Sequence, residues 1–181
     1  MTPVASAANV LRASVGAPQD TLIRLLDDLA AVVLQASASV YTAKPLPGVS
    51  GSVGQHVRHV LDHVTSLVTA RPYGSITYDA RERGTPIETD RSAALRAMLR
   101  LKPLVTGLTD DVLDSPVVVS ALLARGHEPD SARSTFRREL FFVIDHTIHH
   151  QALIATLLAI ADEGVPDGFG FAPSTPGPVS S

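Results

Sequence analysis

The chain has 181 residues, of which 45% are apolar and 18% are charged, and its formal net charge is −3. This composition predicts one globular domain with a substantial core rather than a disordered chain, and the charge gives no reason to expect nucleic acid as a partner. The absence of cysteine excludes disulfides, thiolate zinc sites and a cysteine nucleophile. The sequence has no apolar run of about 18 residues and no secretory signal pattern, so we expect a cytoplasmic protein without a membrane span.

The N-terminal third of the chain predicts a flexible lead-in over residues 1–17, followed by a helix. From Asp20 to about Ser39, leucine and valine recur at helical spacing. The prolines and glycine that follow Lys44 end this helix.

The second predicted helix starts with a capping box and carries three histidines. In a capping box of Ser52 and Gln55, each side chain binds the free backbone N–H of the other residue. The apolar face that follows ends near Ala70, before a proline. Three histidines lie on or beside this face: His56, His59 and His63.

Two further helices are predicted after a polar connection over residues 71–88. The third starts at Thr89 or Asp90 and is bent or ended by Pro103. The β-branched run between Asp114 and Ser134 predicts a small β-hairpin or an extended excursion.

The fourth helix is long and ends the predicted folded unit. It starts after an N-cap at Ser134, continues to Glu163 and stops at Gly164. We therefore expect an all-α, up-and-down four-helix bundle over residues 18–164 and a Pro/Gly-rich tail over 165–181, in which Phe169 and Phe171 pack on the body.

The histidines of the second and fourth helices predict a metal site. His146 and His150 stand four residues apart and project from the same face of the last helix, so they can bind one ion together. His59 is the expected third ligand. The alternative is that each histidine caps a helix, forms its own hydrogen bonds or faces water. We favour a metal because one cation satisfies several buried neutral imidazoles at once.

Four other side chains near these ligands are assigned less specific roles. His56 and His63 are expected to be hydrogen-bond partners, pocket walls or ligands to an additional ion, and His149 is expected at the rim or at a helix interface. Glu139 is a fourth ligand or a general base, or else forms a salt bridge to an arginine such as Arg58 or Arg137.

Three protein ligands leave coordination positions open, which is typical of catalytic sites. Nitrogen ligands suit zinc, nickel, iron or copper, and the sequence does not choose among them. Arg81 and Arg83 in the polar connection either bind an anionic group of a substrate or lie in a solvated loop.

The segments around these histidines resemble the DinB-like (YfiT-like) family of metal-binding four-helix bundles. SVGQHVRHVLDH resembles the second-helix motif of that family, with His59 at the ligand position. RELFFVIDHTIHHQALI resembles its last-helix H-x-x-x-H motif, with His146 and His150 as ligands. The resemblance spans about Asp20 to Ala161 and implies a three-histidine divalent-metal site in a protein that forms homodimers.

The family resemblance also implies candidate activities. Characterised members include S-transferases that use small thiols and a thiol-dependent isomerase. We therefore expect a metal-dependent enzyme, a transferase or a hydrolase, whose small-molecule substrate includes a low-molecular-weight thiol. The alternatives are a mono- or dinuclear oxidative metalloenzyme and a non-enzymatic, stress-induced metal-binding protein.

Overall fold

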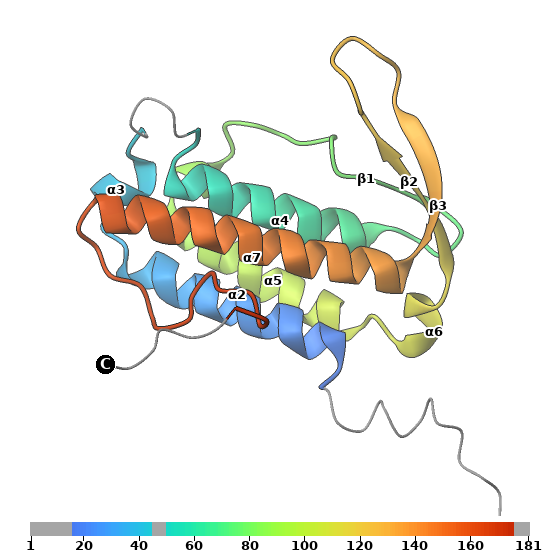
Figure 1. Ribbon diagram of the computed structural model, residues 1–181, viewed down its shortest axis with the longest axis horizontal. Coiled ribbons are helices and arrows are strands. Elements are labelled where there is room, and N and C mark those ends of the chain that lie inside the picture. Colours follow the sequence, from blue (N-terminus) through green and yellow to red (C-terminus); the bar gives the residue numbers. More distant parts are fainter. Residues whose placement is uncertain (1–15, 45–49, 176–181) are drawn as a thin grey trace, which may run out of the picture.

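Four long helices enclose the core of the protein (Figure 1). The structure is a computed structural model that describes residues 16–44 and 50–175. Helix α2 contacts α5 and α7, and α4 contacts the same two helices, so apolar faces from all four meet in one core. The long helices are α2 (Pro18–Gln35), α4 (Val53–Thr69), α5 (Arg91–Thr106) and α7 (Phe136–Ile160). Shorter helical elements are α3 (Ala38–Thr42), η1 (Pro86–Glu88) and α6 (Asp110–Leu113).

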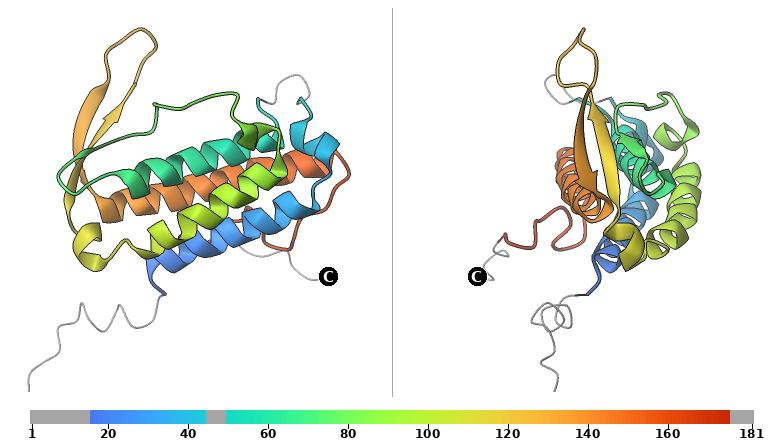
Figure 2. Two further views of the ribbon diagram at one scale, coloured as in Figure 1. Left: turned by 180° about the vertical axis from the view of Figure 1, so that it is seen from behind. Right: turned by 90° about the vertical axis from the view of Figure 1, so that its right-hand side faces the viewer.

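The long helices do not alternate in direction, which differs from the predicted up-and-down order. Helices α4 and α5 run the same way, as do α2 and α7 (Figures 1 and 2). The chain between α4 and α5 therefore crosses back along the outside of the bundle, and η1 lies beside the start of α4. We call residues 70–90 the crossover.

The crossover is held against α4 by a glycine and an ion pair. Gly54 lies so close to the backbone of Glu88 that a Cβ atom at this position would collide with the Glu88 carbonyl oxygen. The buried guanidinium of Arg58 forms an ion pair with Glu88 at 2.8 Å and one with Asp62 at 2.5 Å. These contacts fix the return path of the chain.

A small sheet lies at one end of the bundle. Strands β2 (Pro116–Ala121) and β3 (Asp130–Thr135) are antiparallel, which confirms the hairpin predicted before the last helix. Strand β1 (Ser75–Thr77), from the crossover, pairs with β2 in parallel and was not predicted. Only the central residue of β1, Ile76, is buried, so this strand has almost no apolar pattern in the sequence.

One helix start agrees with the prediction from the sequence, and three other helix ends differ from it. The capping box of Ser52 and Gln55 is confirmed at the start of α4. Pro103 lies inside α5, which continues to Thr106, and α7 is capped by Thr135 rather than Ser134. The first helix is shorter than predicted, because the chain bends after Gln35 and α3 follows as a separate element.

The described part of the C-terminal tail packs against the bundle through one of its two phenylalanines. Phe169 is buried whereas Phe171 is exposed. A Cβ atom at Gly170 would lie 2.6 Å from the backbone nitrogen of Ala152, so the tail contacts α7 closely. The predicted lead-in lies, up to residue 15, outside the described residues. Within the described ranges, no helix is both long and apolar enough to cross a membrane.

Candidate metal centre

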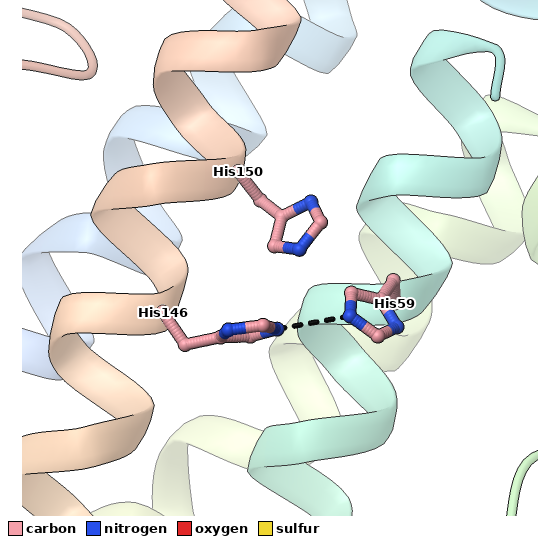
Figure 3. Close-up of side chains that lie close together, drawn as sticks. All are labelled: His59, His146 and His150. Carbon is pink, nitrogen blue, oxygen red and sulfur yellow. Dashed lines mark hydrogen bonds between the residues drawn. The ribbon is translucent and has the colours of Figure 1, made fainter. Parts of the chain in front are cut away.

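His59, His146 and His150 converge between α4 and α7. His59 projects from the middle of α4, and the other two project from α7 one turn apart (Figure 3). The Nε2 atoms of His59 and His146 lie 2.9 Å apart. One nitrogen from each of the three rings lies within 4.8 Å of the other two, so the structure brings the three predicted ligands within reach of a single ion.

Burial keeps these three imidazoles neutral. It lowers the pKa of His59 to about 2, that of His150 to about 3 and that of His146 to about 4. The positive charge that neighbouring imidazoles would carry when protonated lowers each value further. At neutral pH the rings therefore carry lone pairs, and a set of three neutral nitrogen donors fits a divalent transition metal.

His63 and two aromatic residues form a wall on one side of the triad. The His63 ring stacks between Tyr78, at a centroid distance of 4.9 Å, and His146, at 4.0 Å. Phe142 stacks on His146 at 5.6 Å. The Nδ1 atom of His63 donates to the backbone carbonyl of His59 at 2.9 Å. This packing supports the role of a pocket wall for His63.

The remaining two histidines of the clusters differ in burial. His56 is buried, and its Nδ1 atom lies 2.9 Å from Nδ1 of His150. Burial lowers the pKa of His56, and an interaction with the backbone of Ser50 partly opposes this. His149 is exposed beside His150, with a ring-centroid distance of 5.3 Å.

Of the two arginines singled out in the crossover, only Arg81 reaches the histidines. Its Nη1 atom lies 2.5 Å from Nδ1 of His59, and the side chain is half-buried. Arg83 is exposed, and it takes part in none of the hydrogen bonds or ion pairs found in residues 16–44 and 50–175.

Glu139 lies apart from the triad in a fully buried site near the strands. Its carboxylate accepts hydrogen bonds from Tyr78 at 3.0 Å, from Ser134 at 2.6 Å and from Arg138 at 2.7 Å. The predicted alternative, a salt bridge, is therefore present, but with Arg138. Because three donors already occupy the carboxylate, the geometry supports a role in holding the strands to α7.

Tyr78 and Phe142 were missed as site residues by the sequence reasoning. Tyr78 lies in the polar crossover, whose path depends on contacts far along the chain. Phe142 lies in an apolar run of α7, where a phenylalanine is typical of the core. The only signal for Phe142 was its spacing of four residues before His146, which places both on one helix face.

Comparison with known proteins places these residues in a family context. The sequence profile of the DinB superfamily matches residues 21–154, which include all three converging histidines. A curated protein named FK506-binding protein 5, from Rhizopus delemar (strain RA 99-880), is 37% identical to the chain over 101 residues. The alignment covers 55% of this chain and 26% of that protein, so the chain spans about a quarter of the length of the relative it matches.

Proposed function

Because this chain belongs to the DinB superfamily, we propose that His59, His146 and His150 bind one divalent metal ion. The observation that carries the proposal is the convergence of three neutral imidazoles from two helices on one point. One nitrogen of each ring lies within 4.8 Å of the other two, so a shared cation could accept a lone pair from all three rings at once.

We further propose that the metal serves catalysis, in the transfer of a small thiol. A three-histidine site leaves coordination positions for a thiol or a water molecule, whose pKa a bound metal lowers. The aromatic wall of His63, Tyr78 and Phe142 packs against one of the three rings, that of His146. The thiol requirement is an expectation from the family and not from this geometry.

Arg81 is our candidate for binding an anionic group of the substrate. When His59 binds a metal through Nε2, its hydrogen is on Nδ1, and that atom can no longer accept from a guanidinium. Arg81, which contacts this Nδ1 atom, would then have its hydrogens available for another acceptor beside His59. A carboxylate or phosphate of the substrate fits this place.

Metal analysis of untagged protein tests the binding proposal. We expect close to one divalent ion per chain in the purified wild type and a loss of most of it in His146→Ala. Equal metal content in the two proteins would contradict the assignment of the ligands. A polyhistidine tag must be absent because it binds the same metals.

An assay of thiol transfer tests the catalytic proposal. The metal-loaded protein is mixed with a low-molecular-weight thiol and an electrophile, in parallel with Zn²⁺, Ni²⁺, Mn²⁺ and Fe²⁺. We expect turnover in the wild type and background rates in His59→Ala. Rates that are the same in both proteins would remove the transferase proposal and leave the metal site to be judged by its own test.

A second candidate is an oxidative centre with one or two ions, which the contact between His56 and His150 favours because it places a fourth imidazole beside the three. Two ions per chain, or an optical band on addition of Fe²⁺ and air, would support this candidate. A single tightly held zinc ion would argue against it. The homodimer expected from the family stays a prediction that sedimentation analysis can test.

A further inference from the structure

His56 and His150 share a buried hydrogen bond that the three-ligand site does not use. Their Nδ1 atoms lie 2.9 Å apart, and each residue is 8% exposed. We propose that His56 is a positioning residue for the ligand His150: Nδ1 of His56 accepts the hydrogen on Nδ1 of His150, so that His150 presents the lone pair of Nε2 to the metal. This inference rests on the proposed metal site and concerns a histidine that does not touch the ion.

The chemistry of paired imidazoles allows two arrangements, and only one suits a ligand. A hydrogen bond between two neutral rings requires one nitrogen with a hydrogen and one without. If His56 donated, His150 would carry its own hydrogen on Nε2 and could not bind a metal there. If His150 donates, Nε2 is free. Metal-bound histidines characteristically donate their other N–H to a fixed acceptor, and His56 is placed to be that acceptor.

The start of α4 holds His56 in place independently of His150. His56 is the fourth residue of the helix, directly after the capping box, and its backbone N–H donates to the Ser52 carbonyl at 3.0 Å. Gly51 has a φ of 93°, which side-chain-bearing residues rarely adopt, and a Cβ atom there would lie 3.3 Å from Nε2 of His56. The turn before α4 is thus packed against the outer edge of the ring.

The outer edge of the His56 ring offers no competing strong bond. Nε2 of His56 is buried and has no hydrogen bond of ordinary geometry among the residues described, although the Ser50 backbone interacts with the ring. The contact with His150 is therefore the well-formed hydrogen bond that orients this side chain.

His63 provides a comparison within the same helix. It is buried one turn beyond His59, as His56 is buried about one turn before it. His63 contacts the ligand His146 by ring stacking, and its Nδ1 atom is bonded to a backbone carbonyl. Loss of His63 removes packing from a ligand, whereas loss of His56 removes a hydrogen-bond acceptor.

Two substitutions at position 56 separate the acceptor from the packing. His56→Leu keeps a side chain of similar size but has no hydrogen-bond acceptor. His56→Asn places a carbonyl oxygen near the position of Nδ1. We expect His56→Leu to bind zinc about 10–100-fold more weakly than the wild type and His56→Asn to recover most of that loss. In urea unfolding, we expect His56→Leu to be at least as stable as His56→Asn, because leucine is the better helix former. Zinc affinity is measured by competition with a chromophoric chelator, with His63→Leu as the packing control.

The outcomes distinguish this inference from the proposed metal site. A wild-type protein that does not bind zinc would overturn both. Wild-type binding together with equal affinities for His56→Leu and His56→Asn would overturn only the role of His56. Long-range ¹H–¹⁵N spectra of the imidazoles in zinc-loaded wild type give a second measurement that needs no variant. We expect the hydrogen of His150 on Nδ1, and a hydrogen on its Nε2 would contradict the proposal.

Discussion

At the scale of single residues, the contrast between Arg81 and Arg83 gives a direct test of substrate binding. Arg81 reaches His59, whereas Arg83, two residues away, is exposed. We expect Arg81→Ala to weaken the binding of mercaptoacetate to the cobalt-loaded protein about tenfold, the value of one charge-assisted hydrogen bond. The change in the visible cobalt spectrum measures binding. Arg83→Ala is the matched control, and an equal loss in both variants would point to a general effect of charge.

The three converging histidines could be predicted because they lie on helices. Helix geometry fixes the relation between His146 and His150, and both belong to a strongly apolar run. Arg81 could only be suggested and Tyr78 was missed, because both lie in a connection whose path is set by tertiary contacts. Local periodicity says nothing about where such a connection returns to the bundle.

At the scale of elements, the contact between Gly54 and η1 controls the position of the crossover. We expect Gly54→Ala to destabilise the protein by about 2 kcal/mol or more, because its Cβ atom would collide with the Glu88 backbone. The intrinsic helix propensity of alanine would predict the opposite sign. Urea unfolding measures the effect. Gly164→Ala is the control, since a Cβ atom there meets no other atom, and similar values for the two variants would contradict the collision.

The buried carboxylate of Glu139 ties the crossover and β3 to α7. Tyr78→Phe removes one of its three donors while keeping the ring that stacks on His63. We expect a loss of about 1–3 kcal/mol in the free energy of unfolding, because a buried acceptor loses a partner, with zinc content unchanged.

Tyr73→Phe is the control for this measurement, because Tyr73 is 81% exposed. A loss of zinc in Tyr78→Phe would show instead that this network supports the metal site directly.

The pairing of β1 with β2 shows why strand β1 could not be predicted from the sequence. The hairpin of β2 and β3 is local, and its β-branched run predicted it. Strand β1 pairs with residues 43 positions later, as Ser75 does with Val118. Its three residues acquire strand geometry from this partner rather than from their own propensity.

At the scale of the whole molecule, the buried histidines should make the metal-free protein sensitive to acid. In the unfolded chain histidines titrate near pH 6.5, whereas burial lowers the pKa of His59 to about 2 and of His150 to about 3. Between these values the unfolded chain binds more protons than the folded one, so stability falls as the pH falls.

We expect each such histidine to lower the free energy of unfolding by about 2 kcal/mol between pH 7 and pH 5. Urea unfolding in EDTA measures this dependence. A His150→Leu variant should show a shallower slope, and an unchanged slope would contradict the assigned pKa of this residue.

The family and the mostly helical architecture could be predicted from the sequence, but the helix directions could not. The profile match over residues 21–154 confirms the family. Amphipathic patterns identify helices without fixing their orientation, and a connection of the length of residues 70–90 can either turn back or return along the bundle. The contacts of Gly54 and Arg58 with Glu88, which select the return, are visible only once the chain is folded.

The separation of the candidate ligands along the chain has a consequence for how the protein matures. His59 precedes His146 by 87 residues, and α7 is the last of the long helices to be synthesised. A nascent chain on the ribosome would thus display one imidazole of the three throughout the synthesis of the 87 residues that separate His59 from His146. Binding of one ion by all three histidines would require that α7 has been translated, so the protein would be made without its metal and would acquire it after synthesis of this helix.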